Sequence, residues 1–323
     1  MTGALLEVED LHIRFGGLHA VRGTALTVAK GETHCLVGES GCGKSVTALA
    51  MMGLLAPSAK RTAAVLRFDG QDMRAMKERE LSLLRGDRMA MIFQEPMTSL
   101  NPAYTVGSQM AEVFRRHRTT TRAAALERAE SLLAKVRITS PGLRLGQYPH
   151  QLSGGLRQRV MIAMALMCDP ELLIADEPTT ALDVTVQAQI LRLLLDLQRE
   201  LGLAMLLITH DLGVVARMAH RVSVMYAGEV VESGTAAAVF GRPTHPYTQG
   251  LLSCVPVPGK VKHDEPLGSI PGVVPRIGES FRGCGFRDRC AHATAACAES
   301  IPRQAADAGH EYLCVLPAGR LAA

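Results

Sequence analysis

The sequence predicts an α/β protein with a largely parallel sheet, followed by a small irregular extension. Up to about residue 240, short apolar runs alternate with longer helical patterns, as parallel α/β architecture requires. Beyond that point the composition changes, because seven of the sixteen prolines fall between Gly241 and Ser280 and half of the eight cysteines follow near the end of the chain. We therefore expect one large domain and one cysteine-bearing appendage.

The individual elements follow from apolar spacing. Helices are expected over Ala123–Val136 and Val186–Glu200, where apolar residues recur at three-to-four spacing. The proline-rich stretch after residue 240 is expected to continue neither a helix nor a central strand, and to form a partly extended connection. Buried parallel strands are expected at four apolar runs: His34–Val37, Met89–Phe93, Leu172–Ala175 and Met205–Thr209.

Composition limits the classes of function. The chain has 323 residues, and its net charge of +4 comes from 35 basic and 31 acidic residues, a balance that argues against nucleic acid as the main ligand. Apolar runs such as Val160–Met167 fall well short of the ~20 residues that a bilayer requires. Acidic residues interrupt the apolar start, so no signal peptide is expected and the chain should stay in the cytoplasm. In that reducing compartment clustered cysteines indicate metal or redox chemistry rather than disulfides.

A phosphate-binding loop is predicted at Gly38–Ser45, GESGCGKS, which lies between an apolar strand and a helical run. Glycines let backbone amides turn toward an anion, and the following helix directs its positive N-terminus at the same point. Lys44 would reach the β- and γ-phosphates, and the Ser45 hydroxyl would ligate magnesium. The predicted nucleotide contacts here are Gly38, Glu39, Ser40, Gly41, Cys42, Gly43, Lys44, Ser45 and Val46.

Two acidic residues follow a second apolar strand, in the sequence LLIADE. Asp176 and Glu177 stand at the carboxyl end of that strand, where ligands bind in open α/β sheets. Asp176 is expected to hold magnesium, and Glu177 to act as the general base that polarises the attacking water. An acidic pair after a strand is otherwise a common helix start.

Four further segments resemble the Q-loop, signature, D-loop and H-loop of ABC ATPases: Gln94 in MIFQEP, LSGGLRQR at Leu152–Arg159, Ala181–Asp183, and His210 in LLITHD. Their order and spacing cover nearly all of residues 5–240. The resemblance implies a P-loop NTPase fold, with a RecA-like core and antiparallel β and helical subdomains. The ATPase domain would span residues 1–240, with the helical subdomain over about 95–160, and the extension would span 241–323.

The resemblance also implies how the remaining residues act. ATP would lie between the P-loop of one subunit and the signature of its partner, so Ser153, Gly154, Gly155 and Gln158 would contact the partner's nucleotide. Exposed amides at a helix start suit that role. Gln94 would join the magnesium shell, His210 would contact the γ-phosphate, and Asp183 would act across the interface. Phe15 stands where this family places an aromatic that stacks on adenine, although it could equally close the first hairpin.

Cys284, Cys290, Cys297 and Cys314 suggest a shared metal. Structural zinc usually shows a tight CxxC pair, which is absent, whereas a four-thiolate iron–sulfur cluster tolerates wider spacing. Iron–sulfur, zinc and unligated thiols all remain open on these residues alone. THPYTQGLLSCVP and GCGFRDRCAHATAAC resemble the C-terminal extension of oligopeptide/dipeptide and nickel importer ATPases, members of which carry a [4Fe–4S] cluster. Cys35 and Cys42 are expected to be core residues.

The leading hypothesis is the ATP-hydrolysing subunit of an ABC importer for dipeptides or oligopeptides, with a nickel importer ATPase as the nearest alternative. Its implied partners are a second ATPase subunit, two integral-membrane permeases, and an extracytoplasmic solute-binding protein that acts through the permeases. The chain would work at the cytoplasmic face of the membrane. Two further hypotheses are a soluble ABC protein that acts on nucleic acid or ribosomes, and a regulatory subunit that binds ATP without cleaving it.

Overall fold

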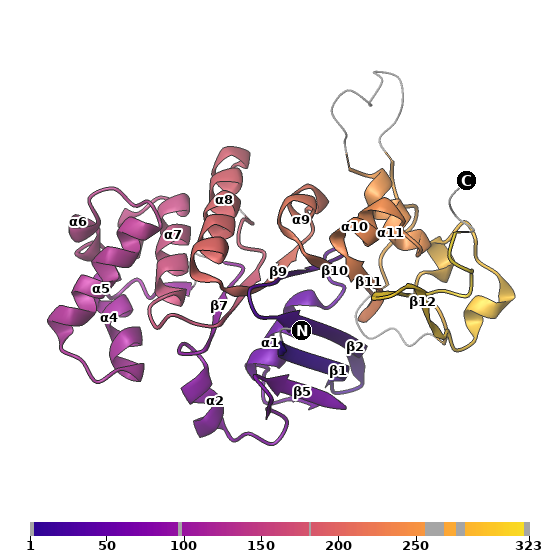
Figure 1. Ribbon diagram of the computed structural model, residues 1–323, viewed down its shortest axis with the longest axis horizontal. Helices are drawn as coiled ribbons and strands as arrows, with labels where there is room; N and C mark the ends of the chain where they lie inside the picture. The colour runs from indigo at the N-terminus through magenta and orange to yellow at the C-terminus, as the bar shows by residue number, and fades with distance from the viewer. Residues whose placement is uncertain (1–2, 96–98, 181, 256–267, 276–281, 320–323) are drawn as a thin grey trace. The chain divides into compact units, whose positions relative to one another are not determined.

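The computed structural model (Figure 1) describes residues 3–95, 99–180, 182–255, 268–275 and 282–319. The chain divides into two compact units. The first, here called the helical unit, comprises Met1–Leu5, Ala29–Glu32 and Ala75–Leu207. The second, the P-loop unit, comprises Leu6–Val28, Thr33–Arg74 and Ile208–Ala323.

The P-loop unit contains an antiparallel sheet with the order β2-β1-β5-β6, in which β4 also pairs with β1. Burial alternates along β1 over Leu6–Glu9 and again over Leu11–Arg14, and in both stretches the buried side chains are the apolar ones, as a sheet with one covered face requires. This is the antiparallel β subdomain that the sequence led us to expect. Its strands are β1 (Ala4–Phe15), β2 (Leu18–Ala29), β4 (Ala59–Thr62), β5 (Val65–Phe68) and β6 (Gln71–Asp72).

A second set of strands in the same unit has the order β12-β13-β11-β10-β3. All five residues of β3 are buried, and β3 pairs in parallel with β10, as its continuous apolar run predicts. The extension adds two strands, because β13 pairs antiparallel with β11 and β12 with β13. These strands are β3 (Thr33–Val37), β10 (Arg221–Tyr226), β11 (Glu229–Thr235), β12 (Arg303–Asp307) and β13 (His310–Leu313).

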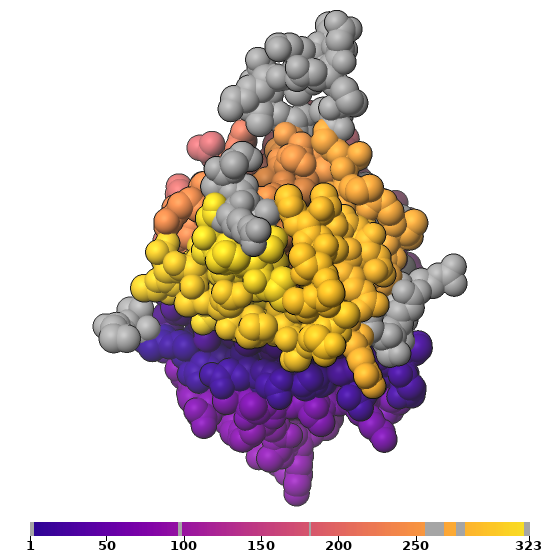
Figure 2. All heavy atoms as spheres, turned by 90° about the vertical axis from the view of Figure 1, so that its right-hand side faces the viewer, coloured from indigo at the N-terminus to yellow at the C-terminus, as the bar shows by residue number. Residues whose placement is uncertain are grey.

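The prediction that the proline-rich stretch continues no helix is wrong for part of its length. Helix α11 (Pro246–Ser253) begins there with Pro246 in the first turn, where proline's missing amide costs nothing and its fixed φ suits the helix. The other helices of this unit are α1 (Lys44–Met52), α9 (Leu212–Met218) and α10 (Ala236–Gly241), with short 3₁₀ turns at η2 (Arg287–Arg289) and η3 (Ala295–Ala298). Figure 2 shows residues 282–319, coloured toward yellow, gathered on one face beside the orange residues of α10 and α11.

In the helical unit, β7 (Met89–Ile92) pairs in parallel with β8 (Leu172–Asp176), and β9 (Ala204–Thr209) is the neighbour of β8. The four predicted strands are therefore confirmed, each to within a residue of the expected boundary. The two predicted helices are confirmed as α5 (Arg122–Lys135) and α8 (Val184–Leu201).

A group of helices between β7 and β8 occupies one end of this unit (Figure 1). Thr105 and Thr121 cap α4 and α5 by accepting hydrogen bonds from Ser108 N and Ala124 N, which satisfies donors that a helix start leaves unpaired. The remaining helices are α2 (Glu78–Leu84), α4 (Val106–His117), α6 (Pro141–Leu145), η1 (Pro149–Gln151) and α7 (Gly154–Ala165). None of the helices in the described part of the chain is both long and apolar enough to span a bilayer.

Candidate functional site

The loop between β3 and α1 has the backbone of an anion cradle. Gly38 passes so close to its neighbours that an added Cβ would lie 2.2 Å from the Met225 carbonyl oxygen and 2.9 Å from Cys42 Sγ. Gly41 and Gly43 adopt φ angles of 80° and 106°, which side chains disfavour. Cys42 and Cys35 are 1% and 0% exposed, so both are core residues as expected.

The start of α1 supplies the positive charge. Gly43 caps this helix without any side-chain hydrogen bond, so no capping side chain blocks a ligand from the helix start. Lys44 is 4% exposed, and its ammonium donates to the carbonyl oxygens of Gly38 at 2.9 Å and Glu39 at 3.0 Å. Ser45 and Val46, both partly exposed, occupy the same first turn. The geometry of the loop therefore suits a phosphate chain.

The helical unit carries the acidic pair at the end of β8. Asp176 is the last residue of the strand and is 4% exposed. Glu177 has a φ of 44°, a backbone conformation that costs a non-glycine residue about 1 kcal/mol or more and is concentrated at functional sites. Its carboxylate accepts hydrogen bonds from Gln94 Nε2 at 3.2 Å and from Thr180 Oγ1 at 2.9 Å. The structure thus joins Gln94 to Glu177, and their catalytic roles stay predictions.

The predicted signature opens α7. Ser153 caps that helix by accepting a hydrogen bond from Leu156 N at 3.4 Å, and an added Cβ on Gly155 would lie 2.9 Å from Val186 Cγ1. Gln158 lies one turn further along and is 1% exposed, so its side chain packs inside the unit. Asp183 caps α8 through Val186 N at 3.0 Å, while Ala181 lies outside the described residues.

The two remaining residues predicted to contact nucleotide belong to the P-loop unit. His210 follows β9 and is exposed, and the next residue, Asp211, caps α9 through Gly213 N at 2.8 Å and Val214 N at 3.2 Å. Phe15 is the last residue of β1 and is half-buried. The P-loop, Phe15 and His210 thus lie in one unit, and Gln94, Asp176, Glu177 and the signature in the other. That Ser45 and Asp176 share one magnesium ion stays a prediction.

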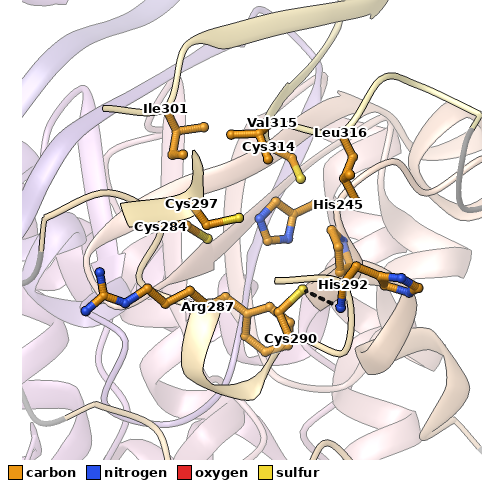
Figure 3. A pocket seen from close by; sticks show the side chains of 12 residues that line it. His245, Cys284, Arg287, Cys290, His292, Cys297, Ile301, Cys314, Val315 and Leu316 are labelled. Carbon is orange, nitrogen blue, oxygen red and sulfur yellow. Dashed lines mark hydrogen bonds between the residues drawn. The ribbon is translucent and has the colours of Figure 1, made fainter. Parts of the chain in front are cut away.

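The four C-terminal cysteines line a single pocket of the P-loop unit (Figure 3). Cys284 and Cys290 flank η2, Cys297 lies in η3, and Cys314 directly follows β13. The backbone amide of Cys284 donates to the Cys297 carbonyl oxygen at 2.8 Å, so these two segments are joined directly. Burial, together with the thiols of Cys297, Cys314 and Cys290, raises the pKa of Cys284 to about 11. The four cysteines that the sequence assigns to one shared metal therefore line one pocket, and the metal itself stays a prediction.

Gathering in one pocket does not by itself make a metal site. Across the described ranges, no three or more His, Cys, Asp or Glu side chains are placed to hold a metal ion. Figure 3 shows the sulfurs of Cys284, Cys297 and Cys314 toward the pocket and that of Cys290 across from them, where it accepts a hydrogen bond from His292 N at 3.4 Å. The four sulfurs surround the pocket without converging on one ion position.

Sequence reasoning missed two residues that contact the P-loop. The Arg289 guanidinium binds the Glu39 carboxylate at 2.8 and 3.1 Å, and Tyr247 Oη accepts a hydrogen bond from Glu39 N at 2.9 Å. More than 200 residues separate each of them from the loop, so no local pattern could have indicated the contact.

Known proteins resemble this chain over most of its length. The family model described as "ABC transporter" matches residues 21–180, and that described as "Oligopeptide/dipeptide transporter, C-terminal region" matches residues 231–297. The probable peptide ABC transporter ATP-binding protein y4tR of Sinorhizobium fredii is 52% identical, covering 92% of this chain and 90% of its own. The dipeptide transport ATP-binding protein DppD of Escherichia coli is 51% identical, covering 93% of this chain and 92% of its own.

Solved structures agree with the fold. A bacterial ABC transporter cassette in dimeric form superposes with a TM-score of 0.64 at 27% identity, covering 72% of this chain and 98% of that one. An ATP-binding cassette bound to ADP and Pi in a post-hydrolysis state gives a TM-score of 0.64 at 26% identity, covering 72% and 98% respectively.

Proposed function

The chain belongs to the ABC transporter family of ATP-hydrolysing subunits, and we propose that the transport it drives is the import of dipeptides and oligopeptides. The observation that carries this proposal is the match of residues 231–297 to a C-terminal region described for oligopeptide/dipeptide transporters. Relatives of similar length that are named for peptide or dipeptide transport support it.

We propose that hydrolysis uses the residues described above. The P-loop amides and Lys44 bind the phosphates, and Glu177 accepts the proton of the attacking water while Gln94 orients its carboxylate. His210 would steady the γ-phosphate from its position after β9. The Ser45 hydroxyl, the Gln94 amide oxygen and the buried Asp176 carboxylate are oxygen donors of the kind that Mg²⁺ prefers. Magnesium, when bound with ATP, neutralises the developing phosphate charge.

The signature has no role on this chain's own nucleotide in our proposal. The start of α7, with Ser153, Gly154 and Gly155, offers a second set of helix-start amides, which would meet the ATP of a second ATPase subunit. We propose a heterodimer at the cytoplasmic face of the membrane, with Asp183 at its interface and Phe15 stacked on adenine. The helical subdomain, about residues 95–160, would grip two permeases that receive peptide from a solute-binding protein, and residues 241–323 would form the extension.

The assembled transporter tests this proposal. The chain is produced together with the permeases, second ATPase and solute-binding protein that the proposal requires, placed in lipid vesicles, and assayed for ATP hydrolysis with and without candidate solutes. We expect dipeptides or oligopeptides to stimulate hydrolysis. They should also accumulate on the side of the vesicle membrane where the ATPase subunits lie. Stimulation by Ni²⁺ instead of peptides would overturn the substrate assignment, and co-purification with ribosomes or DNA in place of permeases would overturn the importer.

We further propose that Cys284, Cys290, Cys297 and Cys314 hold a [4Fe–4S] cluster that ties the extension into one module. Four thiols on one pocket supply the donor set, and a cluster tolerates thiolates that do not converge on one ion. Anaerobic purification should give brown protein with about four iron and four sulfide per chain. Cys297→Ser should lose this colour, and Cys254→Ser, outside the pocket, should keep it. Colourless protein with stoichiometric zinc, or with no metal, would overturn the cluster.

A further inference from the structure

The P-loop residue Glu39 is held from outside the loop by the C-terminal extension. Its side chain and its backbone have different partners there. Arg289 Nη1 donates to Glu39 Oε2 at 2.8 Å and Nη2 donates to Oε1 at 3.1 Å, so the guanidinium and carboxylate form a bidentate ion pair. The Glu39 amide donates to Tyr247 Oη at 2.9 Å. Both the side chain and the peptide group of this residue are therefore fixed by segments that follow the ATPase motifs.

The guanidinium of Arg289 is itself held firmly. Its side chain is 5% exposed, and its Nε donates to the Pro271 carbonyl oxygen at 2.8 Å, while Nη2 also donates to that of Ile270 at 3.3 Å. The guanidinium carbon lies 5.8 Å from the Tyr226 ring centroid and 5.9 Å from that of Phe286. A planar, always charged group with its donors occupied and two aromatic rings beside it makes a rigid, directional partner for a carboxylate.

The position of Glu39 matters to the lysine that binds phosphate. Lys44 Nζ donates to the carbonyl oxygens of both Gly38 and Glu39, at 2.9 and 3.0 Å. A shift of the Glu39 peptide therefore moves an acceptor of the Lys44 ammonium and the amides that line the loop. A loop rich in glycine has many accessible backbone conformations. The contacts of Arg289 and Tyr247 with Glu39, here called the anchor, restrict these conformations before ATP binds.

We propose that Arg289 is a positioning residue for ATP binding, which acts through Glu39 to hold the P-loop in its phosphate-binding shape. Tyr247 supports it through the Glu39 amide. The contact uses no thiol and does not depend on the transported solute, so it concerns the ATPase reaction alone. Once ATP is bound, the phosphates order the loop whether or not the anchor is present. Loss of the anchor should therefore raise KM for ATP and leave kcat nearly unchanged.

The experiment is a double-mutant cycle on the full chain in its assembled transporter, with KM and kcat for ATP as readouts. Arg289→Gln and Glu39→Gln should each raise KM about tenfold, equivalent to about 1.4 kcal/mol, with kcat at saturating ATP within about twofold of wild type. The double variant has the wild-type net charge at the site. It should keep the raised KM of either single variant, because both changes remove the same pair.

Three further variants make the test specific. Arg242→Gln removes another arginine–carboxylate pair of the extension, with Asp307, and should leave KM unchanged. Arg289→Lys keeps the charge but not the bidentate geometry, so its KM should lie between those of wild type and Arg289→Gln. Tyr247→Phe should raise KM less than Arg289→Gln does. If Arg289→Gln does not fold, the KM values of Tyr247→Phe and Arg289→Lys test the proposal instead.

Two outcomes would overturn the proposal. One is an unchanged KM in folded Arg289→Gln and Arg289→Lys. The other is recovery of the wild-type KM in the double variant, which would show that only the charge beside the phosphates matters. Lys44→Ala, which should lose MgATP binding altogether, confirms that the assay detects the nucleotide site.

Discussion

Gln94 Nε2 donates a hydrogen bond to Glu177 Oε2 across 3.2 Å, so a residue just after β7 is joined to the residue that follows β8. The two strands pair in parallel, and their carboxyl ends therefore meet at one edge. Thr180 Oγ1 donates to the same Glu177 oxygen at 2.9 Å. Two donors on one carboxylate oxygen hold the Glu177 side chain in one orientation.

Glu177→Gln should separate binding from hydrolysis. The amide is close in size to the carboxylate but cannot accept a proton, so MgATP affinity should stay near wild type while kcat falls about 10²–10⁴-fold. Equilibrium nucleotide binding and single-turnover hydrolysis in the assembled transporter measure the two effects. Thr180→Val, which removes a donor and leaves the base in place, is the matched control and should reduce kcat far less. A Gln variant that hydrolyses ATP at the wild-type rate would contradict the assignment.

Gly38→Ala should disable the P-loop more severely than Gly41→Ala. An added Cβ on Gly38 meets the Met225 carbonyl oxygen at 2.2 Å, so loop or strand has to move, whereas that on Gly41 meets nothing within 4 Å. A displacement of about 1 Å at a reacting group can cost about 100-fold, and we expect that loss in kcat/KM for Gly38→Ala. Gly41→Ala carries only the strain of its positive φ, about 1–3 kcal/mol. Equal losses in the two variants would contradict the steric argument.

Acidification should destabilise the chain between about pH 6.5 and pH 3. Burial lowers the pKa of His34 to about 4 and that of His245 to about 3. Below pH 6.5 these histidines bind protons in the unfolded state but not in the folded state. The free energy of unfolding therefore falls as pH falls through this window. At pH 5 the His34 contribution alone amounts to about 2 kcal/mol.

His34→Gln should reduce this pH dependence, because glutamine does not titrate. His34 Nδ1 is 2.7 Å from the Thr27 carbonyl oxygen and Nε2 is 2.8 Å from Ser223 Oγ, contacts that an amide can partly replace. Urea unfolding at pH 7 and pH 5, at one ionic strength, gives the slope for each protein. His150→Gln, on an exposed side chain, is the control and should keep the wild-type slope. An identical slope in His34→Gln would contradict the prediction.

Glu232→Ala should detach the extension from the sheet. This carboxylate on β11 is 0% exposed and accepts four hydrogen bonds: from Thr244 N at 2.8 Å, Thr244 Oγ1 at 2.9 Å, His245 N at 2.8 Å and His310 Nε2 at 2.8 Å. Removing it leaves buried donors unpaired, which should lower the free energy of unfolding by about 3–5 kcal/mol.

The matched control lies on the strand that pairs with β11. The Glu311 side chain is 55% exposed and lies 3.9 Å from Arg303, so Glu311→Ala should change the free energy of unfolding by less than about 1 kcal/mol. Urea midpoints of the two variants and of wild type provide the comparison. Similar midpoints for Glu232→Ala and wild type would show that β11 does not anchor the extension.

The sequence predicts those elements whose pattern lies within a short stretch of chain. The β3 strand, the glycines of the P-loop and the helix after Lys44 follow from an apolar run, a turn requirement and a helix pattern within a short stretch of chain. The same holds for β8 with Asp176 and Glu177, and for the start of α7 at Ser153. The density of prolines after residue 240 predicts no helix, and that prediction is wrong at α11. Pro246 occupies the first turn of this helix, where a proline is tolerated and from which the helix can continue.

The sequence by itself therefore predicted the chemistry of a nucleotide site, because ATP hydrolysis depends on residue types at fixed short spacings. It also indicated that four thiols belong together. Only the tertiary structure decided that these thiols line one pocket, that β12 and β13 extend the sheet, and that Arg289 holds Glu39 across 250 positions of sequence. An ion pair between distant segments produces no periodic pattern in the sequence, because each residue alone looks like an ordinary charged side chain.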